Sequence, residues 1–284
     1  TNTNTNTNTN TNTNIDDAFS YFHPLDNGFQ VLFEQLLLDP RFEEGRIITK
    51  WKDLEKKNKN LTMRNISRFL YHLTQTLLKN TELTSDKPYF QPHFFEATHL
   101  MICRCIFPRS KELVQCIVTK NSEKDISYSK QLAWMSELTQ EQLGVDARLC
   151  GPKHSTAYAQ AIQHIKEVEI GICLTPQDSV IGLIEAVHSI QKTATAYYHD
   201  HCPNAQDKDI VVNGDTLFPI VVFCVIQSTV HTWHAWLHCM ENFFRKEILY
   251  FGQSGFCFTL LKATISYVMS RTPSHFTSDT KTDT

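Results

Sequence analysis

The part of the chain that most restricts its fold is an uninterrupted apolar run, Leu217 to Ile226. These ten residues are too few to cross a bilayer, which takes about 20. By periodicity alone, the run can be a buried strand or a buried helix. The residues around it favour a helix, because Gly214, Asp215 and Thr216 are cap-type residues and Pro219 is tolerated in a first helical turn. A helix that is apolar on every side lies in the middle of a core.

The composition is that of a globular chain with free thiols. Of the 284 residues, 41% are apolar and 20% charged, which allows a sizeable core in one or two domains. The net charge of −3 gives no basic field, so we expect no nucleic-acid partner. The chain has nine cysteines, an odd number, and their spacing matches no disulfide framework. This indicates free thiols in a reducing compartment. The sequence shows no signal peptide or membrane span, so we expect a cytoplasmic protein that reaches membranes only through its partners.

Apolar side chains three and four residues apart predict helices along most of the chain, and no stretch alternates as a strand does. The first 14 residues are the exception, because alternating Thr and Asn cannot form a core. We therefore predict an all-α fold in which an N-terminal helical bundle packs on a layered helical core. The predicted units are a disordered low-complexity tract at 1–14, the bundle at 15–85, the core domain at 90–271 and a disordered tail at 272–284.

Within these units, helices are predicted wherever apolar residues recur on one face, and polar stretches are predicted as loops. The bundle helices are predicted around 29–37, 47–54 and 62–78. The core helices are predicted at 94–107, 111–118, 126–138, 155–168, 175–196, 217–226, 233–244 and 256–269. The predicted connections that matter below are the polar segments 121–124, 197–212 and 251–254.

Three stretches, taken in order, resemble the Vps-nine (vacuolar protein sorting nine) domain family. Thr175-Pro176-Gln177-Asp178 is similar to the family's Ser/Thr-Pro-x-Asp helix start. Asp215, with Leu217, Phe218 and Pro219 and the rest of the apolar run, is similar to the family's acidic residue, two apolar residues and proline at the start of an apolar helix. Gly255-Phe256-Cys257-Phe258-Thr259-Leu260-Leu261 resembles the family's Gly-Tyr-Tyr-apolar-Thr-x-Leu helix. The resemblance covers about 90–270.

The resemblance implies a guanine-nucleotide exchange factor for Rab GTPases of the Rab-five class, with cytoplasmic and endosome-associated localisation. Such exchange makes and breaks no covalent bond, so no cofactor and no metal site are predicted. The GTPase holds its nucleotide through Mg²⁺ and a P-loop lysine. A carboxylate at a helix N-terminus can pair with that lysine and disfavour phosphate at the same place.

The resemblance also implies the site residues, and two of them depart from the family pattern. The family's exchange aspartate falls at Thr216, preceded by Asp215, and its supporting tyrosine falls at Cys257. We expect the turn that bears Asp215 and Thr216 to lie beside the start of the last helix and to form one exposed groove with it. The implied GTPase-binding residues are Asp215, Thr216, Pro219, Cys257, Thr259 and Leu260.

Several alternatives stay open. Because both principal exchange residues are replaced, the chain is either a factor with weakened exchange or a catalytically inactive interaction or scaffold module with the Vps-nine fold. Asp215 and Thr216 can also serve only as a helix cap. The spacing of His231, His234 and His238 is helical, but a zinc site needs about four ligands and no second pair has a recognised spacing. No glycine-rich phosphate loop is present, and no motif orients a cysteine for thiol hydrolysis.

Overall fold

The computed structural model describes residues 27–57, 63–80, 92–109, 111–151, 157–169, 175–203, 213–243, 249–250 and 252–275. Every regular element in these ranges is a helix, which confirms the all-α prediction. The Thr-Asn tract at 1–14, the residues between the predicted bundle and core at 86–89, and most of the predicted tail at 272–284 lie outside the described residues. In the described part of the chain, no helix combines the length and the apolar character that a membrane span requires.

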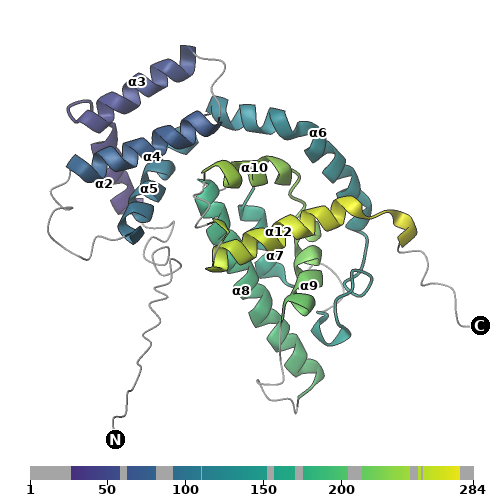
Figure 1. Cartoon of the computed structure of the whole chain (residues 1–284). Coiled ribbons are helices and arrows are strands. Elements are labelled where there is room, and N and C mark those ends of the chain that lie inside the picture. The colour runs from purple at the N-terminus through teal and green to yellow at the C-terminus, as the bar shows by residue number, and fades with distance from the viewer. Residues whose placement is uncertain are drawn as a thin grey trace, which may run out of the picture.

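The N-terminal helices α2 (Asn27–Leu38), α3 (Glu43–Lys57), α4 (Met63–Asn80) and α5 (Pro92–Ile106) lie together at one end of the molecule (Figure 1). Helices α3 and α4 each bury one apolar face, as the three- and four-residue spacing predicts, whereas α5 is buried on every side from Glu96 to Ile106. Trp51 of α3 stacks on Phe69 of α4 with 4.1 Å between the ring centroids. Helix α4 also contacts α10, so the bundle packs directly on the rest of the molecule.

The remaining helices form the core domain around α9. They are α6 (Lys111–Met135), α7 (Ala159–Glu167), α8 (Pro176–His201), α9 (Gly214–Gln227), α10 (Trp233–Phe243) and α12 (Gly252–Ser270), with short 3-10 turns at Phe107–Arg109, Ala147–Leu149 and Pro273–His275. Helix α6 arches from the bundle around the others (Figure 1). Helix α9 packs on α7, α8 and α12, and every residue from Leu217 to Ile226 is buried except Phe218 and Pro219. The apolar run is therefore the predicted central helix.

The predicted loop at 121–124 is wrong, because α6 is one continuous helix through these residues. Its polar residues lie on the solvated side of the helix, where they do not interrupt the backbone hydrogen bonds. The Asn121 side chain donates a hydrogen bond to the carbonyl of Ile117 at 3.0 Å, within the same helix. A polar stretch at this position therefore marks an exposed face and not a break.

Two other predicted loops are partly helical. Helix α8 continues to His201 because Tyr197 still packs on the core, edge-on to Tyr158 with 5.4 Å between the ring centroids. Helix α12 begins at Gly252, so the predicted loop at 251–254 is wrong as well. Gly252 has a φ of +62°, a left-handed conformation that glycine adopts without strain, and this allows the helix to start early.

A buried ion pair joins α5, which packs on α2 and α4, to the start of α8. Arg104 of α5 donates to one carboxylate oxygen of Asp178 in α8 through Nη2 at 2.6 Å and through Nε at 3.0 Å. The other Asp178 oxygen accepts from the Thr175 hydroxyl at 2.8 Å, and the Asp178 N–H donates to that hydroxyl at 3.1 Å, which caps α8. The Arg104 and Asp178 side chains are only 2% and 4% exposed. A charge at this depth is costly unless it is paired, so the start of α8 requires α5.

A second set of buried polar contacts runs beside the ion pair. The Thr74 hydroxyl of α4 lies 2.8 Å from Nδ1 of His99 in α5, and Nε2 of His99 lies 3.7 Å from the Cys103 sulfur. Gln177 of α8 donates to the same sulfur at 3.6 Å. Burial raises the pKa of the Cys103 thiol, which therefore stays protonated. Helices α4, α5 and α8 thus share a polar interior as well as an apolar one.

We expect Asp178→Asn to lower the free energy of unfolding by about 3–5 kcal/mol, because it removes the counter-charge of the buried Arg104. Urea unfolding followed by circular dichroism measures this loss. The matched control is Asp146→Asn in the exposed Asp146–Arg148 pair, also 2.6 Å long, which should cost at most about 1 kcal/mol. Equal, small losses in the two variants would show that the ion pair does not join the bundle to the core.

Candidate functional site

The N-terminus of α9 is exposed, although most of the helix is buried. The Asn213 side chain caps it, because Oδ1 accepts the backbone N–H groups of Asp215 and Thr216, both at 3.1 Å. The Thr216 hydroxyl donates to the Asn213 carbonyl at 3.1 Å. The sequence suggested that Gly214, Asp215 or Thr216 forms the cap, and the structure corrects this to Asn213. The exposed Asp215 carboxylate therefore has no part in the cap.

The sequence placed Pro219 in the first turn of α9. In the structure it is the sixth residue of the helix and lies beyond that turn. Since proline has no N–H, it cannot make the regular helical hydrogen bond to the Asp215 carbonyl four residues earlier. Asp215 itself is exposed, so the first turn of α9 presents a carboxylate that a cationic group of a partner can reach.

The other predicted site residues lie on two faces of α12. Cys257 is 2% exposed and Leu260 is 9% exposed. Both line a cavity of about 10 Å³ together with Val221 and Val225 of α9, which is hardly room for one water molecule. Thr259 lies on the exposed face of α12 instead. The structure therefore brings Cys257 and Leu260 to α9, but beneath the surface.

Among the described residues, the turn of α9 that bears Asp215 and Thr216 does not lie beside the start of α12, where the sequence led us to expect one exposed groove. Phe218, near the start of α9, packs edge-on to Tyr267 in the C-terminal half of α12, with 5.7 Å between the ring centroids. Cys257, near the start of α12, shares its cavity with Val221 further along α9. At 1.5 Å rise per residue, Asp215 lies about 9 Å along the helix axis from Val221. The exposed turn of α9 is therefore nearer the end of α12 than its start.

Two exposed aromatic side chains near the start of α12 are candidates that the sequence analysis did not single out. Tyr250 and Phe256 are each 46% exposed. Phe256 lies one turn from Thr259 on the exposed face, whereas the next residue, Cys257, points into the core. Aromatic residues are enriched at protein interfaces, so Phe256 is the better-placed contact for a partner. The sequence alone does not show which of the neighbours Phe256 and Cys257 is exposed, because this depends on which face of α12 packs on the core.

The other chemistries considered from the sequence find little support in the described residues. In the ranges that the structure describes, no three His, Cys, Asp or Glu side chains are placed to hold a metal ion. Of the two cysteines that the sequence leaves as possible nucleophiles, Cys257 and Cys202, the structure buries Cys257, which is 2% exposed. His234 and His238 line a separate pocket on the far side of α12.

Comparison with known proteins identifies relatives of the core domain. The family model described as the vacuolar sorting protein 9 (VPS9) domain matches residues 158–273, which include the first turn of α9 and all of α12. The Alsin homolog of Drosophila melanogaster is 26% identical over 161 residues, which are 54% of this chain and 10% of that protein. The chain thus spans about a tenth of the length of this relative. The match begins at residue 158, so the domain boundary at 90 stays a prediction.

We expect Cys257→Tyr, which would restore the family's tyrosine, to lower the free energy of unfolding by about 1–3 kcal/mol. The reason is that a cavity of about 10 Å³ cannot take the additional ring without moving α9 or α12. The matched control is Phe256→Tyr at the exposed neighbouring position, which should leave stability unchanged. Thermal unfolding of both variants tests this expectation. A Cys257→Tyr protein as stable as the parent would mean that the cavity opens readily into a groove.

Proposed function

We propose, from the match of residues 158–273 to the VPS9 domain, that the chain regulates a small GTPase of the Rab-five class by acting on nucleotide exchange. A VPS9 domain implies a role like that of a Rab exchange factor. The observation that carries the proposal is the exposed first turn of α9, where Asp215 stands clear of the helix cap. The site residues from the sequence analysis stay predictions of this proposal.

The mechanism follows from what holds a nucleotide in a GTPase. Mg²⁺ and a P-loop lysine bind its phosphates. The exposed Asp215 carboxylate supplies an acceptor for that lysine when the nucleotide leaves. The same negative charge disfavours a returning phosphate. Groups that bind the nucleotide-free GTPase better than the loaded one shift the equilibrium towards release.

We propose that exchange is weakened in this chain. The family's aspartate is replaced by Thr216, whose hydroxyl is bound to the backbone of Asn213. One residue along a helix rotates a side chain by about 100°, so Asp215 does not aim where an aspartate at 216 would aim. Cys257 lies beneath the surface and offers a GTPase no aromatic side chain. The exposed Phe256 is the remaining aromatic contact in that turn.

A second candidate function is a scaffold module that binds a GTPase without exchanging its nucleotide. The observation that favours it is a packed α9, buried from Ile220 to Ile226, together with substitutions at both principal exchange positions, Thr216 and Cys257. In either case we propose a cytoplasmic, endosome-associated protein that reaches the membrane through its GTPase.

We expect Thr216→Asp to accelerate nucleotide release from a Rab-five-class GTPase by about tenfold or more, the effect of one added charged hydrogen bond. An aspartate in the first turn of α9 is also compatible with the helix dipole, so the fold should be kept. The measurement is release of a fluorescent guanine nucleotide, with the full chain at increasing concentration. Asp215→Asn should remove most of the exchange that the parent protein has.

The matched control is Thr119→Asp, which makes the same chemical change at an exposed position of α6. If neither the parent nor Thr216→Asp accelerates release, but both retain the nucleotide-free GTPase in a pull-down, the scaffold function is correct. If no GTPase of the class is bound in either nucleotide state, both candidate functions are wrong.

A further inference from the structure

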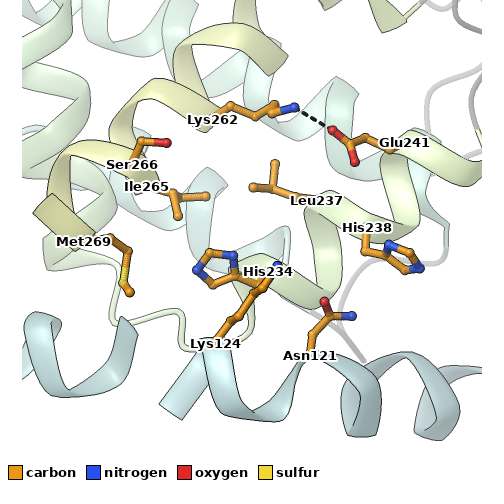
Figure 2. Close-up of a pocket in the computed structure, with 10 residues that line it drawn as sticks. All are labelled: Asn121, Lys124, His234, Leu237, His238, Glu241, Lys262, Ile265, Ser266 and Met269. Atoms are coloured by element: carbon orange, nitrogen blue, oxygen red, sulfur yellow. Dashed lines mark hydrogen bonds and ion pairs between the residues drawn. The ribbon is translucent and has the colours of Figure 1, made fainter. Parts of the chain in front are cut away.

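A second pocket lies on the side of α12 that faces away from α9. Its volume is about 490 Å³, and side chains of α6, α10 and α12 line it (Figure 2). Lys262 of α12 faces α10 on this side, whereas Tyr267 contacts α9 on the other. The volume falls within the range of about 300–1,000 Å³ that is typical of small-molecule sites. The pocket is thus separate from the turn that carries Asp215.

The ammonium groups of the two lysines that line this pocket have N–H donors that no hydrogen bond among the described residues uses. Lys124 of α6 is exposed, and within the described part of the chain its ammonium has no hydrogen bond or ion pair. Lys262 donates to a carboxylate oxygen of Glu241 at 2.6 Å, which occupies one of its three N–H groups. In Figure 2, Lys124 lies beside His234, and the Lys262–Glu241 pair lies across the pocket.

The neighbouring imidazole is also left without a partner. Nε2 of His234 is buried, and no hydrogen-bonding group among the described residues reaches it. Burial and the nearby Lys124 lower the pKa of His234, so the ammonium and a charged imidazole would repel each other. The carboxylate of Asp125 accepts the backbone N–H groups of His234 and Ala235 at 2.8 and 3.3 Å, at the start of α10, and among the described residues it forms no ion pair with Lys124. An anion beside Lys124 would complete this end of the pocket.

The wall between the two polar ends is apolar. Leu237, Ile265 and Met269 line it, and Figure 2 shows Leu237 and Ile265 between Lys124 and the Lys262–Glu241 pair. A bare inorganic anion would leave this surface uncovered. A ligand that matches the whole pocket therefore joins an anionic group to an apolar body.

We propose that this pocket binds a phosphomonoester with an apolar body, its phosphate beside Lys124 and its body against Leu237 and Ile265. A phosphate offers several charged acceptor oxygens, so it can accept from more than one of the donors that line the site. Glu241 opposes binding, because its carboxylate repels the phosphate and holds Lys262. The proposal does not depend on nucleotide exchange.

The test uses phenyl phosphate as the probe and the ¹³C-labelled methionine methyl groups of the full chain as the NMR signal. We expect the Met269 resonance to shift saturably, while Met101, Met135 and Met240, which do not line the pocket, stay unchanged. Phenol, which has the same ring without the phosphate, should bind far more weakly. Absence of a saturable Met269 shift at concentrations on the order of 10 mM, or equal binding of phenol, would overturn the proposal.

Three variants separate this site from a general charge effect. Lys124→Gln should weaken phenyl phosphate binding about tenfold. The matched control, Lys120→Gln, removes the same charge one turn away on α6, outside the lining, and should retain the affinity. Glu241→Gln should tighten binding by about two- to tenfold, an increase that a misfolded variant cannot produce. Equal losses in the two lysine variants, or no gain in Glu241→Gln, would contradict the proposal.

Vesicles identify the source of the phosphate. If vesicles with phosphatidic acid bind the chain and those of phosphatidylcholine do not, and Lys124→Gln abolishes this difference, the phosphomonoester is a lipid headgroup. If phenyl phosphate binds but neither vesicle does, the ligand is a soluble phosphomonoester. Both results support the site.

Discussion

The contact on which the rest of the structure depends is the buried ion pair between Arg104 and Asp178. With the Thr175 cap, it fixes the first turn of α8, and α8 contacts α7, α9, α10 and α12. Asp178 lies inside the segment that matches the VPS9 family, whereas Arg104 comes from α5 before that segment. The matched segment therefore contains a buried charge whose cationic partner lies outside it. In physical terms, α5 belongs to the same folding unit as the candidate site.

In the central helix α9, different residues serve the stability of the fold and the chemistry of the candidate site. Its middle and end are packed on several sides, so these positions accept few substitutions. Its first turn is exposed and is held by the Asn213 side chain, which binds backbone groups and does not depend on the side chains at 215 and 216. Residues in this turn can therefore change without disturbing the core. Helix α9 therefore permits substitutions at positions 215 and 216 while the fold is kept.

The sequence predicts the helices well because each buries an apolar face, and it predicts α9 because a run that is apolar on every side can only be central. What it misses depends on helical phase and on where a helix starts. Helix α12 starts at Gly252, four residues before the predicted start, and its packing on α8 and α9 buries Cys257 and leaves Phe256 exposed. The cap at Asn213 likewise moves Pro219 to the sixth position of α9. The contact of Arg104 with Asp178 spans 74 residues, which no local pattern records.

Helix α12 contacts both α9, which carries the candidate exchange turn, and the pocket proposed to bind a phosphomonoester. On one flank, Tyr267 and Cys257 pack on α9; on the other, Lys262 and Met269 line the pocket with α6 and α10. A ligand in the pocket influences the α9 turn only if it binds one arrangement of α12 better than another. The cavity that α9 and α12 line together with α7 and α8 is only about 10 Å³, so the contact between α9 and α12 is close-packed. The larger space lies on the other flank of α12, so a ligand there would reach the α9 turn by displacing α12 relative to α6 and α10.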